Sequence, residues 1–263
     1  MPTPARIFGA ELLGTAVIVI AGVGASVLAG VSVGALGIAL AFGLATIAMT
    51  LALGPISGAH LNPAVTLGLL LARRVSRAAA TFALLGQVVG ALLGGLVVYG
   101  IASGVEGWDR GQFGANGWGD GSPGGYGLGS VIVAEIVFSA LFVFVVLTLR
   151  SGRHNWAGRA TATGLTLLVI HLVTGSIDGT GVNPAKSLAT AVFSDWDLSY
   201  IKQVWAFLLF PLVGSVVGVF AWLFVDDATI EDTMLDASPL RAARDAGDDL
   251  AERATGAIED VVG

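Results

Sequence analysis

The sequence predicts an all-α membrane protein with six transmembrane helices and two re-entrant half-helices, arranged as an inverted 3+3 repeat. Three observations lead to this fold class. The 263 residues are 55% hydrophobic and only 12% charged, whereas a typical soluble domain has about 25% charged residues. Six apolar runs are each long enough to cross a bilayer. Two shorter apolar segments begin with the same Asn-Pro-Ala triplet.

The six predicted spans are apolar runs of about 20 residues, which is the length a helix needs to cross a ~30 Å hydrocarbon core. They lie at residues 7–29, 34–54, 80–102, 131–149, 158–176 and 203–225. The first run is interpreted as a retained helix, because no small-residue cleavage site of a signal peptide follows it. An even number of spans places both termini on the same side of the membrane.

The distribution of positive charge indicates which side this is. Seven arginines lie at the N-terminus or in loops on its side of the membrane: Arg6, Arg73, Arg74, Arg77, Arg150, Arg153 and Arg159. Only Arg110, Lys186 and Lys202 lie on the other side. Cytoplasmic loops are enriched in Lys and Arg, so both termini are predicted to be cytoplasmic, in a multi-pass protein of the cell (inner or plasma) membrane.

Two apolar segments are too short to span a bilayer. Residues 62–72 and 183–193 would each form a helix of about 16 Å, half of the hydrocarbon core. Each is predicted to be a re-entrant half-helix. Irregular backbone at membrane depth is tolerated only where it is enclosed by protein or lines a cavity, so the loops before the half-helices are predicted to line one.

The two halves of the chain repeat each other. The motif "AELLGTAVIVI" matches "AEIVFSALFVF" 124 residues later, and Asn62 matches Asn183 at an offset of 121. Because each half contains three spans, the second half is inserted upside down relative to the first, as in inverted-repeat transport proteins.

This repeat divides the chain into four predicted segments. They are a first repeat (1–102), a Gly-rich extracellular connector (103–129), a second repeat (130–225) and an acidic cytoplasmic tail (226–263). The connector is either a flexible linker or part of a vestibule. The tail carries 11 acidic residues and 3 arginines, and is expected to be solvated and either disordered or loosely helical. A partner-binding tail is the alternative.

The two triplets have the chemistry of well-formed helix starts. They consist of Asn62, Pro63 and Ala64 in the first half and Asn183, Pro184 and Ala185 in the second. Asn is a favoured N-cap and Pro suits the first helical position. Inversion brings both starts together near the midplane of a central pore, where each carries about half a positive charge and unpaired N–H groups. Such a site repels cations and donates hydrogen bonds to the oxygen of a small neutral solute.

The stretches "SGAHLNPAVT" and "GVNPAKS", together with the duplicated half and its matched glutamates, resemble the aquaporin family of major intrinsic proteins over roughly residues 5–225. The likeness is to the bacterial and archaeal water-selective branch. It implies a passive channel that conducts water down an osmotic gradient and excludes ions and protons. It also implies a homotetramer in a lipid bilayer with one pore per subunit. No cofactor, metal, nucleic acid or catalytic residue is expected.

The family resemblance implies a second, outer constriction built from four positions. Carried over to this sequence they are Phe42, His171, Thr180 and Lys186. The first three match the water-selective pattern, but Lys186 stands where the family usually has Arg. Because Arg and Lys are not interchangeable, Lys186 either repels cations and donates to water as Arg does, or relaxes the selectivity by swinging aside. A core role for His171 is the alternative at that position.

Three further polar residues lie within the apolar segments. Glu11 and Glu135 occupy matched positions inside the first and fourth spans. They are interpreted as structural supports that accept hydrogen bonds from the loops before the half-helices, although an intramembrane carboxylate is also a candidate functional group. His60 is interpreted as a brace of the first loop, with proton sensing as the alternative.

Other functions stay open as alternatives. A broader channel for glycerol, ammonia, hydrogen peroxide or carbon dioxide is the nearest one. A membrane scaffold with a vestigial pore is another. A coupled transporter would need a chain of intramembrane carboxylates, and only Glu11 and Glu135 lie inside predicted spans. The sequence contains no cysteine, which excludes thiol chemistry and disulfides, and no nucleophile–base constellation indicates an enzyme.

Overall fold

The computed structural model describes residues 2–150, 154–196, 199–226 and 228–236. Within these residues the chain contains helices and turns but no strand, which confirms the predicted all-α class. The helices are α1 (Pro4–Ser57), α2 (Pro63–Leu71), α3 (Arg77–Ala102), α4 (Leu128–Leu149), α5 (Trp156–Asp178), α6 (Pro184–Phe193) and α7 (Tyr200–Val225), with 3-10 turns at Gly119–Gly121 and Ile230–Asp232.

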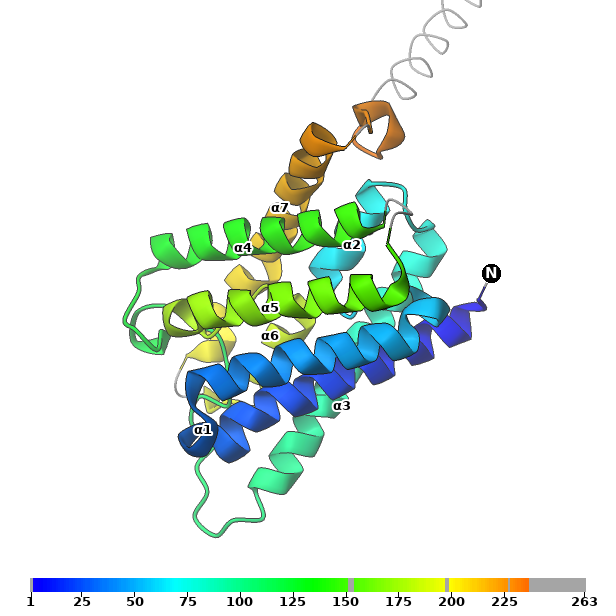
Figure 1. Ribbon diagram of the computed structural model, residues 1–263. Coiled ribbons are helices and arrows are strands. Elements are labelled where there is room, and N and C mark those ends of the chain that lie inside the picture. Colours follow the sequence, from blue (N-terminus) through cyan, green and yellow to red (C-terminus); the bar gives the residue numbers. More distant parts are fainter. Residues whose placement is uncertain (1, 151–153, 197–198, 227, 237–263) are drawn as a thin grey trace, which may run out of the picture.

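Helix α1 holds two antiparallel spans rather than one long rod (Figure 1). The chain reverses at Gly34, whose φ of 61° and ψ of −174° are not helical and are readily adopted only by glycine. A Cβ added to Gly14 would lie 2.9 Å from the Leu53 side chain, and one added to Gly22 would overlap the Phe42 ring. The first arm therefore packs closely along the second, and the two arms correspond to the predicted spans 7–29 and 34–54.

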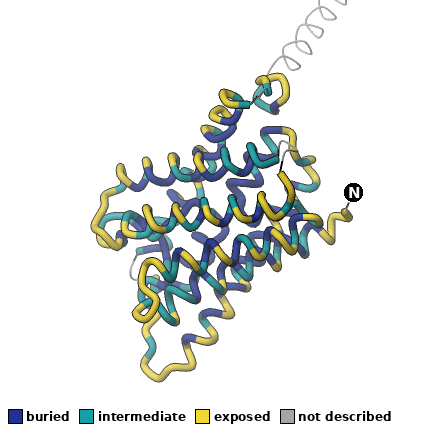
Figure 2. Tube along the Cα trace, in the orientation of Figure 1, coloured by how far each residue is buried: buried dark blue, intermediate teal, exposed yellow. Residues whose placement is uncertain are grey.

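Counted with the two arms of α1, the described residues hold six spans. Helices α1, α3, α4, α5 and α7 each contain an 18-residue window with a mean hydropathy of 1.6 or more. Their outward faces carry large apolar side chains that are more than 40% exposed, as expected of a surface in contact with lipid. Examples are Leu13, Leu44, Leu85, Leu96, Val133, Val137, Leu165, Val169 and Phe220. Figure 2 shows exposed positions along the outside of the bundle and buried ones within it.

The inverted repeat is visible in the packing of the helices. A Cβ added to Gly94 of α3 would lie 2.7 Å from the Ala16 carbonyl oxygen. A Cβ added to Gly218 of α7 would lie 2.6 Å from the Ala140 carbonyl oxygen. Both residues of the second pair stand 124 positions after those of the first, so α7 packs on α4 as α3 packs on the first arm of α1. Small residues at these points let the backbones approach closely.

The half-helices enter from opposite ends of the bundle. Figure 1 shows α2 near the end that carries the N-terminus, whereas α6 follows the turn at the other end. We call the end with the N-terminus, the end of α4 and the start of α5 the inner end. The end with the connector between α3 and α4 is the outer end. The middle of the connector is packed against the helices, because Phe113, Ala115 and Asn116 are each at most 3% exposed, whereas residues 103–107 and 123–127 are exposed.

The first part of the predicted tail is also packed. The Met234 N–H donates to the Leu71 carbonyl at 2.7 Å, and the Arg73 guanidinium donates to the Glu231 carbonyl at 3.2 Å. Residues 228–236 are therefore ordered and held to the helices, although Thr229, Ile230, Glu231 and Asp232 stay exposed, as expected of a solvated tail. The physical reason is that the last carbonyls of α2 need donors from outside the helix, and this segment supplies one. Residues 237–263 of the predicted tail lie outside the described residues.

Candidate functional site at the meeting of the half-helices

The two Asn-Pro-Ala triplets start α2 and α6 in the same way. Asn62 Oδ1 accepts a hydrogen bond from Ala64 N at 2.8 Å. Asn183 Oδ1 accepts from Ala185 N at 3.1 Å and from Lys186 N at 3.3 Å. Each asparagine is thus the N-cap of its half-helix. The proline that follows has no backbone N–H group, so it leaves no donor without an acceptor at the first helical position. The predicted helix starts are present, and both prolines are buried.

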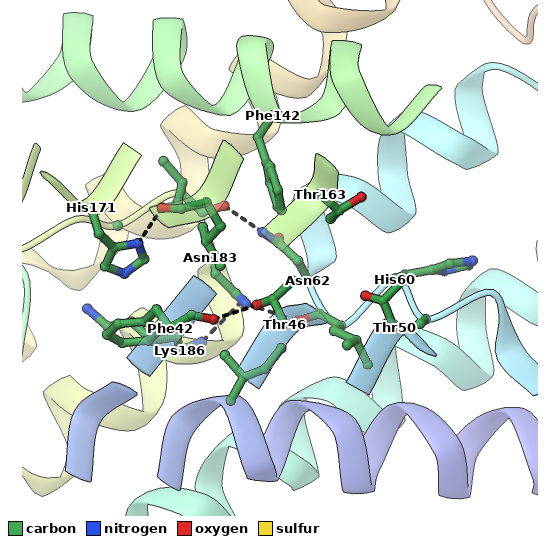
Figure 3. A pocket seen from close by; sticks show the side chains of 16 residues that line it. Phe42, Thr46, Thr50, His60, Asn62, Phe142, Thr163, His171, Asn183 and Lys186 are labelled. Atoms are coloured by element: carbon green, nitrogen blue, oxygen red, sulfur yellow. Dashed lines mark hydrogen bonds between the residues drawn. The ribbon is translucent and has the colours of Figure 1, made fainter. Parts of the chain in front are cut away.

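The same asparagines join the two repeats. Asn62 Nδ2 donates to the Val182 carbonyl at 2.8 Å, and Asn183 Nδ2 donates to the Leu61 carbonyl at 3.0 Å. An amide nitrogen carries two N–H donors, so each asparagine keeps a second one. Both side chains line the same inner cavity. Figure 3 shows them side by side in its centre, with Phe42, His171 and Lys186 on one side and Thr50 and His60 on the other.

The loops before the half-helices share a strained backbone. Ala59 and Leu61 have φ values of 48° and 55°, and Thr180 and Val182 have values of 55° and 45°. The second pair stands 121 positions after the first. Positive φ is uncommon for residues other than glycine, and rarest for a β-branched one. It costs of order 1–3 kcal/mol per residue and persists only where surrounding contacts impose it.

Two buried glutamates supply those contacts. Glu11 accepts from the backbone N–H groups of His60 at 2.9 Å and Leu61 at 2.7 Å. Glu135 accepts from those of Gly181 at 2.9 Å and Val182 at 2.8 Å. Each carboxylate holds two successive N–H groups of one loop, which turns the carbonyls of that loop toward the cavity and the opposite repeat. This geometry is the one expected of structural supports.

His60 lies at the inner part of the cavity and is held by a polar network. Its Nδ1 is 3.2 Å from Thr66 Oγ1, which itself donates to the Asn62 carbonyl at 3.1 Å. Gln87 Nε2 donates to both Thr66 Oγ1 and Glu11, at 2.8 and 2.7 Å. Because the threonine proton is already used, Nδ1 is the donor in this contact, which leaves the buried Nε2 as an acceptor. His60 therefore braces the loop and also lines the cavity.

The four residues predicted for the outer constriction come together. The rings of Phe42 and His171 are stacked with centroids 4.0 Å apart. His171 Nδ1 is 2.9 Å from the Leu167 carbonyl, which accepts only, so the buried Nε2 is an acceptor. Thr180 Oγ1 accepts from Thr174 Oγ1 at 2.9 Å, and the Thr180 carbonyl accepts from Lys186 Nζ at 3.2 Å.

Phe42, His171 and Lys186 separate two cavities along the path. The outer cavity has a volume of about 230 Å³ and is lined by connector residues such as Gln112 and Ala115. The inner cavity is narrow, with a volume of about 30 Å³, and contains the asparagine pair. All three residues line both cavities. The constriction is therefore the boundary at which a solute leaves a wide space and enters a narrow one.

A third cavity of about 20 Å³ continues the path to the inner end. It shares Thr50, His60 and Thr163 with the inner cavity. Two arginines line it: Arg150 donates to the Gly58 carbonyl at 2.5 Å, and the Arg159 guanidinium lies 5.0 Å from the centre of the Trp156 ring. The inner mouth is therefore positively charged. Cavities thus follow one another from the connector to the inner end of the helices.

Comparison with known proteins agrees with this arrangement of paired half-helices and successive cavities. The family model described as Major intrinsic protein matches residues 2–222. The chain belongs to the major intrinsic protein family. It is 41% identical over 230 residues to Aquaporin Z of Photorhabdus laumondii subsp. laumondii, which covers 84% of this chain and 98% of the relative. It is 39% identical over 217 residues to Aquaporin Z of Brucella melitensis biotype 1, with 81% and 94% covered.

A solved structure shares the fold. The X-ray structure of the aquaglyceroporin from Plasmodium falciparum superposes with a TM-score of 0.73, at 24% sequence identity, over 84% of this chain and 96% of that one. At this identity the likeness shows the fold alone. The predicted family and fold class are both confirmed.

Sequence reasoning missed several polar residues of this major intrinsic protein. Gln87 links Glu11 to Thr66, and the connector residue Asn116 and the α5 residue Asp178 contact the outer constriction. Gln87 could have been noticed as a lone amide inside an apolar span. Asp178 could have been noticed as a carboxylate five residues before Asn183. The contact of Asn116 had no sequence signal, because it depends on how the Gly-rich connector folds.

Proposed function

We propose that water crosses this chain through the three successive cavities, and that the asparagine pair and the outer constriction select it. As a major intrinsic protein related to Aquaporin Z over most of its length, the chain is a water channel. The observation that carries the mechanism is a pair of amide donors, Asn62 and Asn183, with a histidine acceptor on each side of it.

This pattern of donors and acceptors orients water. A water molecule beside Asn62 and Asn183 turns its oxygen toward their N–H groups, so its hydrogens point away along the path. The Nε2 atoms of His171 and His60, which have no hydrogen-bond partner among the described residues, are the acceptors available to waters on the two sides. The central water, with its oxygen lone pairs engaged by the amides, is a poor acceptor from its neighbours. Proton hopping is therefore interrupted there, while water itself passes.

Cations are excluded at three points along the same path. Both half-helices direct their positive N-terminal ends at the asparagine pair. Lys186 places a positive charge at the outer constriction, and Arg150 and Arg159 place two more at the inner mouth. A charge at mid-bilayer already costs about 3 kcal/mol or more, and these groups add repulsion for a cation. Water carries no net charge, so neither the cost of a charge at mid-bilayer nor this repulsion applies to it.

We infer that the protein acts as a homotetramer with one pore per subunit in a cell membrane, with both termini cytoplasmic. The apolar outward faces of the helices support a membrane setting, and the arginine-rich inner loops support the orientation. Native mass spectrometry of the purified protein tests the tetramer. Protease accessibility of a tag at each terminus, in inside-out and right-side-out vesicles, tests the orientation.

Stopped-flow light scattering on proteoliposomes tests the function. Osmotic water permeability and glycerol permeability are measured side by side for wild type, Lys186→Arg and protein-free liposomes. We expect fast water flux in the wild type, with glycerol flux no greater than that of lipid alone. Comparable glycerol flux would instead assign a broader neutral-solute channel. Absence of both fluxes from folded protein would assign a scaffold with a vestigial pore, and recovery in Lys186→Arg would locate the block at residue 186.

A further inference from the structure

Lys186 has more acceptors than it has protons. Its Nζ lies 3.1 Å from the Gly114 carbonyl and from Asn116 Oδ1, 3.3 Å from the Gly179 carbonyl and 3.2 Å from the Thr180 carbonyl. An ammonium group has three N–H donors. These four oxygens, which we call the lysine socket, can engage all three donors and then leave none for a water in the path.

The lysine socket joins two distant segments. Gly114 and Asn116 belong to the connector, whereas Gly179 and Thr180 belong to the loop that leads into α6. Asn116 Nδ2 donates to the Asp178 carbonyl at 3.0 Å, and Asp178 Oδ1 accepts from Thr180 N at 2.8 Å. Asn116 and Asp178 thus hold each other in place. Together they also fix the loop whose carbonyls bind the ammonium.

Asp178 also contributes charge. Its side chain is fully buried, and its carboxyl group lies beside that of Glu135. Glu135 already has a task, because its two oxygens hold Gly181 and Val182. Asp178 directly precedes the socket carbonyls of Gly179 and Thr180 in the chain, and negative charge on the carboxyl pair favours an ammonium that stays in the socket.

We propose that Asp178 and Asn116 are positioning residues that hold the Lys186 ammonium out of the water path. Lys186 lines both cavities at the constriction, so an ammonium released from the socket has the path itself to occupy. The lysine side chain is flexible, because its ammonium group stands on a four-carbon stem. Loss of the socket therefore turns Lys186 into an obstruction. This inference rests on the proposed function, and its test includes a measurement that does not need water flux.

The first measurement is the chemical reactivity of the Lys186 amine. The chain has only two lysines, Lys186 and Lys202, and Lys202 is exposed at the start of α7. In a Lys202→Arg background, reductive methylation with formaldehyde is followed at residue 186 by peptide mass spectrometry. We expect slow modification in this background and about tenfold faster modification in both variants, because Asn116→Leu removes an acceptor of the ammonium and Asp178→Asn removes a neighbouring negative charge. Ser26→Ala is the matched control, since Ser26 lines the outer cavity but is not part of the socket.

The second measurement is osmotic water permeability in proteoliposomes. Asn116→Leu and Asp178→Asn should each conduct water severalfold more slowly than wild type. Adding Lys186→Ala to either variant should restore water flux to at least the wild-type rate, because the obstruction is gone. If Asp178 or Asn116 had only a structural role, removing the lysine would not restore water flux.

The outcomes separate this inference from the proposed function. Wild-type protein without water flux would overturn the proposed function, and the methylation rates would still decide whether the socket holds the lysine. Rapid methylation of Lys186 without any socket change would overturn the inference. So would a double variant that stays as slow as its parent. If Asp178→Asn does not yield folded protein, Asn116→Leu and its double variant with Lys186→Ala decide the question alone.

Discussion

Gly43 and Gly164 face each other where the two repeats meet, and each lies against the backbone carbonyl of the other. A Cβ added to Gly43 would lie 2.9 Å from the Gly164 oxygen, and one added to Gly164 would lie 2.5 Å from the Gly43 oxygen. The two positions are equivalent in the repeat, 121 residues apart. The second arm of α1 and helix α5 are therefore in direct backbone contact, with no room for a side chain.

This contact predicts that Gly164→Ala destabilises the protein. In an open helix position alanine is more favourable than glycine by about 1 kcal/mol, but overpacking here costs about 1–3 kcal/mol. We expect a lower midpoint of thermal unfolding in detergent, measured by intrinsic fluorescence. Gly100→Ala in α3 is the control, because a Cβ there meets no atom within 4 Å. An unfolding midpoint for Gly164→Ala at or above that of wild type would contradict the contact.

The asparagine pair predicts a coupled loss of stability and selectivity. Asn183→Ala removes the N-cap of α6, which costs about 1 kcal/mol. It also leaves the buried Leu61 carbonyl without its donor, which costs a further ~1–3 kcal/mol. With one amide donor gone from the centre, we expect slower water flux and a measurable proton leak, followed by a pH-sensitive dye inside proteoliposomes.

Ser76→Ala is the matched control for this variant. Ser76 is the N-cap of α3 and accepts from Ala79 N at 3.2 Å, at an exposed position. Its loss removes a cap without touching the path, so stability should fall while proton exclusion is kept. Proteoliposomes of Asn183→Ala that are as proton-tight as those of Ser76→Ala would show that the amide does not orient water.

The stacked rings predict how the solute range widens. Phe42 and His171 close the boundary between a wide and a narrow cavity. The double variant Phe42→Ala with His171→Gly should admit glycerol while water flux is kept or increased, because the bulk that sets the width has been removed. Glycerol uptake by proteoliposomes is the measurement, and Leu40→Ala, on the same arm but 37% exposed, is the control. Glycerol exclusion in the double variant would place the width limit elsewhere.

The ordered turn at the start of the tail is predicted to be acid-sensitive. Asp232 accepts from Thr229 N at 2.9 Å and from the Thr229 hydroxyl at 3.1 Å. These bonds lower the pKa of Asp232 below its ordinary value of 3.8. Because the pKa in the folded turn is depressed, its stabilising contribution is complete above pH 3.8 and is lost as the pH falls through the lower, folded-state value.

Hydrogen exchange measures this turn directly. The amides of Thr229 and Met234 should be protected at neutral pH and should lose protection, relative to intrinsic exchange, as the pH falls below 3.8. The variant Asp232→Asn should show reduced protection across the whole range, with little dependence on pH. Equal protection of these amides in wild type and Asp232→Asn at neutral pH would show that the carboxylate does not hold the turn.

The sequence by itself determined the architecture of this protein. Apolar runs of span length can only be helices that cross a bilayer, since lipid offers no partner to backbone groups. Two Asn-Pro-Ala triplets in equivalent places of an inverted repeat can only begin half-helices that meet. The same repeat showed that Glu11 and Glu135 occupy equivalent positions. These conclusions needed no contacts, because they rest on segment length, on helix-start chemistry and on symmetry.

The tertiary structure alone decided the surroundings of Lys186. The sequence shows a lysine where related proteins usually have an arginine, but not whether its charge faces the water path. The answer lies with Asn116 and Asp178, which are 70 and 8 residues away along the chain and come together only when the connector folds onto the second loop. Hydrogen-bond partners of this kind depend on how irregular backbone is packed, and neither periodicity nor a local motif encodes them. The folding of the connector onto the second loop therefore decides where the Lys186 charge lies relative to the water path.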